Sequence, residues 1–167
     1  MTTGATSTSS SSAGTPSTTS SGDLRRQTAS ALGFGEVAFT ITPARGASAT
    51  AAEFCALLAE SERQRARGLM GRRDVAGYDG MLFRFDADTT AAFYMRNVPV
   101  ALSIAWFTAD GRFVSSTDMA PCPDQEGCPT YAPARPYRLA LEVLQGGLDR
   151  LGVAEGSVLT VGGACSR

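Results

Sequence analysis

The sequence predicts a mainly β fold (β-rich α+β): a single-domain antiparallel barrel or sandwich of seven to nine strands with two or three short helices. Apolar and polar residues alternate with period 2 in segments such as 81–86 and 137–143, which is typical of strands. Glycines, prolines and an Asp-Gly pair separate these segments. No segment suits the long helical crossover that joins parallel strands, so we expect a mainly antiparallel sheet.

The elements follow in order along the chain. The sequence Asp110-Gly111 predicts a tight hairpin turn between two β-rich segments, because such turns need a positive φ. Residues 60–65 begin with carboxylates and end with arginines, which favours a short helix. The glycine-broken segment 68–80 should be a loop, and Gly146-Gly147 should open another helical turn. Strands are expected at 37–41, 54–59, 81–86, 93–96, 102–107, 113–118, 137–143 and 158–161.

The chain divides into a tail, a connection and one domain. Residues 1–22 are rich in Ser and Thr and contain no charge and no aromatic or branched aliphatic side chain. They cannot bury enough surface to offset the entropy of ordering, so a disordered tail is expected. Residues 23–35 are expected to be a linker or short helix, and 36–165 a single β-rich domain. No apolar run reaches the roughly 18 residues that span a membrane.

The tail and the cysteines bear on localisation. Residues 1–22 lack the basic and apolar regions of a signal peptide. One interpretation is a spacer after a removed export or lipoprotein signal, with any lipid anchor lost together with that signal. The other is a disordered extension of a cytoplasmic protein. We favour an exported, secreted or cell-envelope protein, because the chain has an even number of cysteines, four in all.

The cysteines also predict covalent links. Cys122 and Cys128 flank a short proline-rich loop, and a disulfide between them is expected. Zinc is disfavoured because no histidine can complete a mixed site. Cys55 and Cys165 either form a second disulfide that ties the C-terminal segment to the core, or remain an inert buried thiol and a frayed one. We expect no metal and no cofactor.

Composition limits the function. The 15 cationic residues are all arginine and nearly balance 16 carboxylates, giving a net charge of -1. This balance argues against a nucleic-acid partner, and we expect a monomer. Because the chain has no histidine, Ser-His-Asp, Cys-His and HExxH sites are excluded. Carboxylate pairs remain available for catalysis, but their spacing selects none.

Three separated motifs carry a family resemblance. They are Arg67-Gly68-Leu69-Met70, then Gly80-Met81-Leu82-Phe83, then Phe93-Tyr94-Met95-Arg96-Asn97. In this order, the chain resembles the DUF192 (UPF0127) family of small, often exported domains without an established function, over about 53–162. Relatives usually have Thr after the Asn and then Pro-Leu-Asp, whereas this chain has Val98 and Ala101-Leu102-Ser103. A carboxylate that relatives place there is therefore missing.

Candidate binding residues come from two regions and one isolated acid. Arginines around the glycine loop either bind an anionic ligand or pair with neighbouring carboxylates. Residues of the 93–97 segment that face away from Phe93 and Met95 are expected to join tyrosines in a polar aromatic groove. Glu142 is singled out by its apolar neighbours on an interior strand. The candidates are Arg67, Arg72, Tyr94, Arg96, Asn97, Tyr131 and Glu142, with Tyr137 as a further groove residue.

These features predict an exported or envelope-associated domain whose main role is not catalytic. We expect a binding or accessory module for a small molecule or glycan. The alternative is an enzyme that uses a carboxylate and arginine site without histidine.

Overall fold

The computed structural model describes residue 1, residues 29–44 and residues 52–166. The expected tail at 1–22 lies outside the described residues apart from residue 1, as does most of the expected connection. Residues 29–31 are helical, and Ala29 and Phe34 are buried against the domain. The end of the 23–35 segment is therefore part of the fold.

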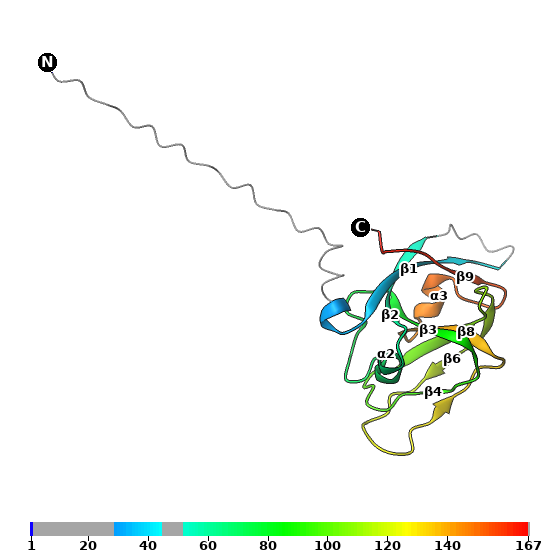
Figure 1. Cartoon of the computed structure of the whole chain (residues 1–167). Helices are drawn as coiled ribbons and strands as arrows, with labels where there is room; N and C mark the ends of the chain where they lie inside the picture. The colour runs from blue at the N-terminus through cyan, green and yellow to red at the C-terminus, as the bar shows by residue number, and fades with distance from the viewer. Residues whose placement is uncertain (2–28, 45–51, 167) are drawn as a thin grey trace.

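Nine strands form two sheets in the described part of the chain (Figure 1). The large sheet has the order β6-β5-β8-β3-β2-β1-β9 and curls into a half-barrel, while β4 and β7 form a two-stranded sheet. The prediction of a mainly β fold is confirmed. The strands are β1 (Gly35–Thr42), β2 (Glu53–Ala59), β3 (Gly80–Thr89), β4 (Phe93–Tyr94), β5 (Leu102–Phe107), β6 (Phe113–Met119), β7 (Thr130–Tyr131), β8 (Tyr137–Leu144) and β9 (Val158–Val161).

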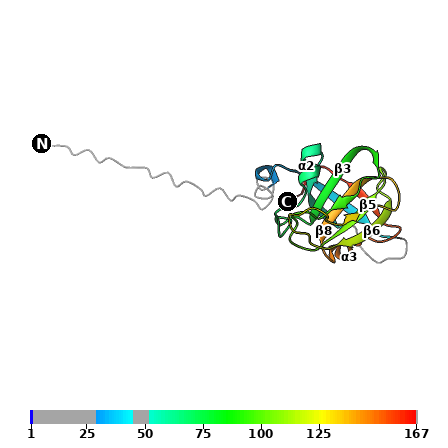
Figure 2. The ribbon, with the colours of Figure 1, turned by 90° about the horizontal axis from the view of Figure 1, so that it is seen from below.

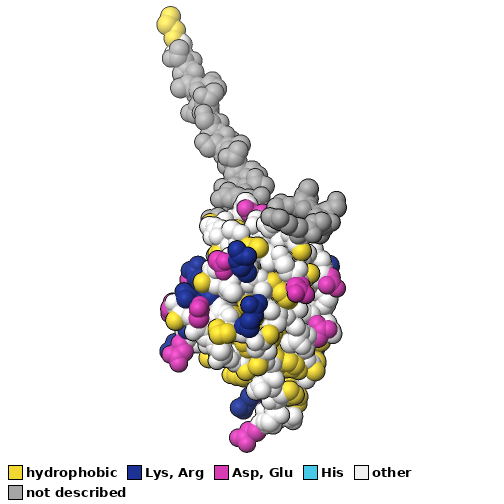
Figure 3. Space-filling model, turned by 90° about the vertical axis from the view of Figure 1, so that its right-hand side faces the viewer, with side chains coloured by type: hydrophobic (Ala, Val, Ile, Leu, Met, Phe, Trp, Pro, Cys, Tyr) yellow, Lys and Arg dark blue, Asp and Glu magenta, His cyan; other side chains and the backbone are white. Residues whose placement is uncertain are grey.

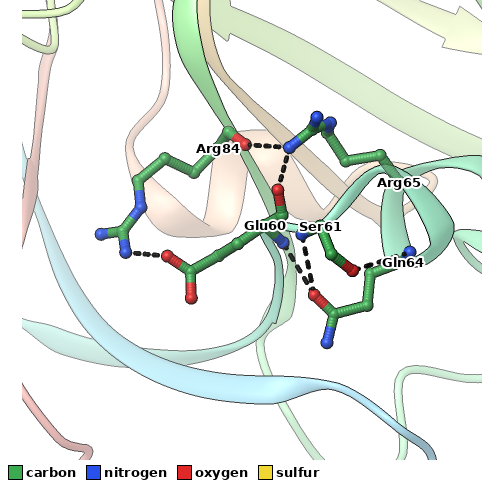
Figure 4. Close-up of polar contacts among 5 residues, drawn as sticks. All are labelled: Glu60, Ser61, Gln64, Arg65 and Arg84. Atoms are coloured by element: carbon green, nitrogen blue, oxygen red, sulfur yellow. Dashed lines mark hydrogen bonds and ion pairs between the residues drawn. The ribbon is translucent and has the colours of Figure 1, made fainter.

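Besides the helical residues 29–31, two short helices accompany the sheet in the described part of the chain. Helix α2 (Glu62–Arg67) begins at a capping box, in which Ser61 and Gln64 satisfy each other's backbone N–H groups (Figure 4). Helix α3 (Gly147–Leu151) buries Leu148. Figure 2 places α2 and α3 at opposite sides of the sheet. No described helix has the length and apolar character needed to cross a membrane.

One pair of strands is parallel, in a sheet that is otherwise antiparallel as expected. Strand β2 runs parallel to β3. Residues 60–79 make the crossover, with α2 followed by the glycine-punctuated loop. A parallel connection needs about a dozen residues or more, and a short helix with a compact loop meets that requirement. Leu69, Val75 and Tyr78 are buried in this loop, which the sequence predicted as a glycine-broken segment.

Contacts between the β5–β6 turn and β9 draw the ends of the curled sheet together. The predicted hairpin is present, with β5 paired to β6. Beyond it, the N–H of Leu159 donates to the Gly111 carbonyl at 2.8 Å, and the N–H of Phe113 donates to the Ser157 carbonyl at 3.1 Å. Gly111 has a φ of 77°, and a Cβ there would overlap the Leu159 carbonyl oxygen.

The large sheet is buried on both faces. One face forms a core within the curl from residues such as Phe39, Leu82 and Leu141. The other face carries Met81, Ile104 and Trp106, and the loops between strands cover it. We refer to the second set as the outer core. Strand β8 lies between β3 and β5, so its side chains enter both cores.

The phase of β8 differs from the prediction at one residue. Period 2 places Tyr137 on the face of Leu139, Leu141 and Val143, but Tyr137 packs in the outer core. The pairing of β3 with β8 is irregular here: Arg84 pairs with Leu139 and Thr89 pairs with Tyr137, so β3 carries the extra residues. The regular period-2 arrangement of side chains is interrupted at this end of β8.

All four cysteines pair within the domain. The Cα atoms of Cys122 and Cys128 are 5.9 Å apart, and those of Cys55 and Cys165 are 5.6 Å apart. Both separations lie in the usual range for disulfides. The second pair links the C-terminal segment to β2, as one of the two interpretations of the sequence proposed.

The contact at Gly111 predicts a large effect of one added methyl group. We expect Gly111→Ala to lower the free energy of unfolding by about 3 kcal/mol or more, because it combines an unfavourable φ with a backbone clash. Urea unfolding measures the change. Gly77→Ala is the matched control, since Gly77 has a φ of 80° but open space around a Cβ, and it should cost about 1 kcal/mol. Equal losses in the two variants would contradict the proposed role of the Leu159 contact.

Candidate functional site

A pocket of about 170 Å³ lies over the outer face of the large sheet, between the end of α2 and strands β3, β4 and β8. Its walls are largely aromatic, and its polar groups are few. A small apolar pocket with a few converging polar groups is the usual form of a ligand site. Its aromatic and charged lining residues are Arg65, Arg67, Phe83, Phe85, Phe93, Tyr94, Tyr137 and Glu142.

Glu142 is a buried acidic residue that lines this pocket. Its side chain is on the outer-core face of β8, where its neighbours in register are Met81 on β3 and Ile104 on β5. The residue is only 4% exposed. Burial among these groups disfavours the ionised form and raises the pKa of the carboxyl group to about 8.

No described residue forms a hydrogen bond with the Glu142 carboxyl group. Trp106 Nε1 is the one fully enclosed side-chain nitrogen or oxygen without a partner among the described residues, so the carboxyl oxygens of Glu142 retain access to the pocket. A carboxyl group in so apolar a setting, with no protein donor, depends on water or a ligand for its hydrogen bonds. Its position therefore calls for a reason other than stability.

Aromatic rings surround this carboxyl group. Phe93 packs edge-on against Phe83 with 5.0 Å between ring centroids, and Phe85 packs against Tyr137 at 5.3 Å. The Tyr137 hydroxyl donates to the Ala91 carbonyl at 2.9 Å, which fixes its ring. Burial also raises the pKa of Tyr137, so its hydroxyl stays protonated at neutral pH. These contacts make the wall pre-organised.

Two arginines from α2 line the rim. Arg65 lies over the Phe85 ring at 4.8 Å, and its Nη1 donates to the carbonyls of Glu60 and Arg84 (Figure 4). Arg67 Nη1 donates to the Leu32 carbonyl at 2.8 Å. These bonds hold each guanidinium through one nitrogen, so other N–H groups of the fork remain for a ligand.

Three predicted site residues line the pocket: Arg67, Tyr94 and Glu142. Tyr94 is 46% exposed, which is unusual for a large side chain in this protein. Tyr137, the further groove residue, lines the same pocket from the end of β8. The pocket thus brings these four residues together.

The other four predicted residues do not line the pocket and make local contacts. Arg72 pairs with Asp74 at 3.0 Å, and Arg96 pairs with Asp124 at 2.7 Å. For Arg72, the structure therefore shows the alternative in which the loop arginine pairs with a neighbouring carboxylate.

Asn97 and Tyr131 accept hydrogen bonds from main-chain N–H groups of neighbouring loops. Asn97 has a φ of 58°, and its main-chain carbonyl accepts a hydrogen bond from the N–H of Gly71 at 2.6 Å. The Tyr131 hydroxyl accepts from the N–H of Ala120 at 2.9 Å. Both residues thus hold the loops that cover the outer core.

Sequence reasoning missed most of the wall. Phe83, Phe85 and Phe93 alternate with other residues along predicted strands, and this alternation gives no sign of an opening above them. Arg65 was counted in the arginine cluster without a site of its own. The spacing Arg65–Arg67 at the end of a short helix is the one signal that could have found it.

Ser103 occupies the position where relatives carry an acid. It is buried, its hydroxyl donates to Asp118 at 2.6 Å, and it accepts from the N–H of Gly146 at 3.1 Å. Hydrogen bonds from Ser103 and Gln145 lower the pKa of Asp118. A carboxylate from β6 thus approaches this position, on the face of β5 that points away from the pocket.

One group of potential metal ligands occurs among the described residues. It consists of Glu36, Cys55 and Cys165, whose ligand atoms lie within 4.8 Å of one another. The two sulfurs are joined in a disulfide, so they are not thiolate ligands.

Comparisons with known proteins agree with this architecture. The DUF192 family model, described as "Uncharacterized ACR, COG1430", matches residues 44–161. A proposed transcription regulator from Sinorhizobium meliloti 1021 has a similar structure, with a TM-score of 0.63 and 26% identity over 77% of this chain and 95% of that one. A protein of unknown function from Novosphingobium aromaticivorans DSM 12444 has a TM-score of 0.62 and 27% identity over 77% and 86% of the two chains. No curated protein matches the sequence significantly.

The buried acid predicts a specific dependence of stability on pH. Between about pH 4.5 and pH 8 the unfolded chain ionises Glu142 while the folded protein keeps it protonated, so stability falls as pH rises through this window. At about 1.4 kcal/mol per pH unit, the loss is on the order of 5 kcal/mol. Urea unfolding at several pH values should show it in the wild type relative to Glu142→Gln. Parallel stability curves for the two proteins would contradict the raised pKa.

Proposed function

This chain belongs to the DUF192 family, and from that premise we propose that it is an exported, non-catalytic domain that binds a small molecule in the pocket around Glu142. The observation that carries the proposal is Glu142, a residue that is only 4% exposed, whose carboxyl oxygens reach the pocket and receive no hydrogen bond from the described residues. Such a group costs stability unless water or a ligand satisfies it. A bound ligand that donates to the Glu142 carboxyl group would offset this loss of stability.

A small molecule suits the pocket better than a glycan. A cavity of about 150 Å³ holds a benzene-sized molecule, and this pocket is about 170 Å³. Sugar hydroxyls need many polar partners. The polar side chains that line this pocket in the described part of the chain are few: Arg65, Arg67, Tyr94, Tyr137 and Glu142. A glycan that stacks on the exposed ring of Tyr94 remains an alternative ligand at the rim.

An enzyme that uses Glu142 and the arginines is the second candidate. A carboxyl group with a pKa of about 8 is suited to proton transfer near neutral pH, which is the observation in its favour. Paired-carboxylate hydrolysis needs a second acid, and Glu142 is the one acid among the described residues that line this pocket. We therefore favour binding.

The Sinorhizobium neighbour is described as a transcription regulator, but the charges of this chain do not favour binding to duplex DNA. The 15 cationic and 16 anionic residues nearly cancel, and on the face in Figure 3 side chains of both signs are interspersed. Duplex DNA favours a continuous basic surface.

Export is supported by the two cysteine pairs, since disulfides persist in oxidising compartments. The proposed setting is secreted or in the cell envelope.

The binding proposal predicts that the pocket takes a small aromatic alcohol. With benzyl alcohol as the probe, amide NMR signals of Gly68 and Phe83 should shift and saturate, because both residues line the pocket. Ala92 is an exposed lining residue, so Ala92→Trp should fill the pocket and abolish these shifts. Ala109→Trp is the matched control at an exposed site in the β5–β6 turn and should leave them unchanged.

Two results would overturn the binding proposal. One is the absence of saturable shifts in the wild type at millimolar probe. The other is equal binding by the wild type and Ala92→Trp, which would place the probe elsewhere.

The export proposal predicts that the protein recovered from its native host carries no free thiol. In denaturant, an alkylating reagent should label no cysteine before reduction and all four after it, because both pairs are oxidised. Mass spectrometry of the intact chain counts the labels. Four labels before reduction would sink the exported interpretation.

A further inference from the structure

We propose that the ligand of this pocket is a small zwitterion, with an ammonium group against Glu142 and an anionic group at Arg65 and Arg67. The inference rests on the proposed binding function and names the chemical class of the ligand. Three features of the pocket carry it: the unpartnered acid, the aromatic wall and the arginine rim.

The acid selects a cationic donor. An ionised carboxylate only accepts hydrogen bonds, and no described residue donates one to Glu142. An ammonium group supplies both donors and a compensating charge, and charge-assisted bonds are the strongest available to such a group. A ligand without a positive charge would leave an ionised Glu142 uncompensated.

The wall favours the same group. Phe83, Phe93 and Tyr137 line the pocket together with Glu142. The faces of aromatic rings attract cations, and their apolar surface accommodates the alkyl part of an amine. Aromatic rings combined with one buried acid are therefore suited to an alkylammonium ion.

The rim requires a negative charge on the same ligand. Arg65 and Arg67 both line the pocket, each with Nη1 held by main-chain carbonyls, and the Arg67 guanidinium lies 5.5 Å from the Phe34 ring centroid. A carboxylate or phosphate group can bind the remaining N–H groups of such a fork. A simple amine leaves these charges unpaired and is repelled by them, whereas a simple anion leaves Glu142 unpaired. A zwitterion satisfies both ends.

The pocket also limits ligand size and gives a pH signature. Its volume of about 170 Å³ admits a hydrocarbon part of roughly four to six carbons. The charged or titratable groups that line the pocket with Glu142 are Arg65 and Arg67 from α2, Tyr94 from β4 and Tyr137 from its own strand, while its neighbours in register, Met81 and Ile104, are uncharged. Because ammonium binding requires ionised Glu142, affinity should rise with pH up to about pH 8.

The test uses calorimetric titration of the full chain with 3-aminopropanoate, 4-aminobutyrate and 6-aminohexanoate. Butylamine and butyrate are the matched probes with one charge each. At least one amino acid should bind about tenfold more tightly than both, and wild-type affinity should rise about tenfold per unit between pH 6 and pH 7.5.

Variants separate the two ends of the ligand. Glu142→Gln should weaken amino-acid binding by about tenfold, remove its pH dependence and leave butyrate within about twofold. Arg67→Gln should weaken the amino acids and butyrate but leave butylamine unchanged or improved. Ala92→Trp should abolish all binding.

The inference and the binding function can fail separately. Zwitterions that bind no better than butyrate, or an affinity that falls as pH rises, would overturn the inference, since the second result indicates a protonated Glu142 that donates to a neutral ligand. Benzyl alcohol shifts that Ala92→Trp abolishes would then still support the binding function. If neither the zwitterions nor benzyl alcohol bind, both proposals fail.

Discussion

The central position of strand β8 is the constraint on which the rest of the structure depends. Its neighbours β3 and β5 bond to both of its edges, and cores cover both of its faces. Residues 139–143 of β8 are therefore all buried, and period 2 places Glu142 in the outer core. The carboxyl group is buried because the strand has no exposed face on which to place it.

The segments that cover the outer face of the sheet leave a pocket beside the buried Glu142. Helix α2 and the glycine loop make the parallel crossover from β2 to β3, which carries Arg65, Arg67 and Leu69 over the sheet. The short β4 brings Phe93 from the other side. These segments enclose the carboxyl group without donating a hydrogen bond to it, so the space between them stays open to a small molecule.

The sequence predicted the strands well because alternation and turn residues are local signals. It predicted the parallel pair and the shifted phase of Tyr137 poorly, since strand partners and bulges depend on distant residues. Among the site candidates, Glu142 was recognised from its apolar neighbours, a signal contained in a few residues. Arg72 and Arg96 were chosen for the same charge that Arg67 carries, and only the fold shows that Asp74 and Asp124 neutralise them.

Stability alone would favour an apolar residue at position 142. Leu or Met there would pack against Met81 and Ile104 without the desolvation cost of an acid. The aromatic wall adds to the contrast, because it lowers the local polarity that would otherwise ease ionisation. The same enclosure strengthens any charge-assisted bond that a ligand makes with the carboxylate. The burial that disfavours the ionised carboxyl group also strengthens its bond to a ligand. The loss of stability at Glu142 and the selectivity of the pocket for a ligand therefore have one physical origin.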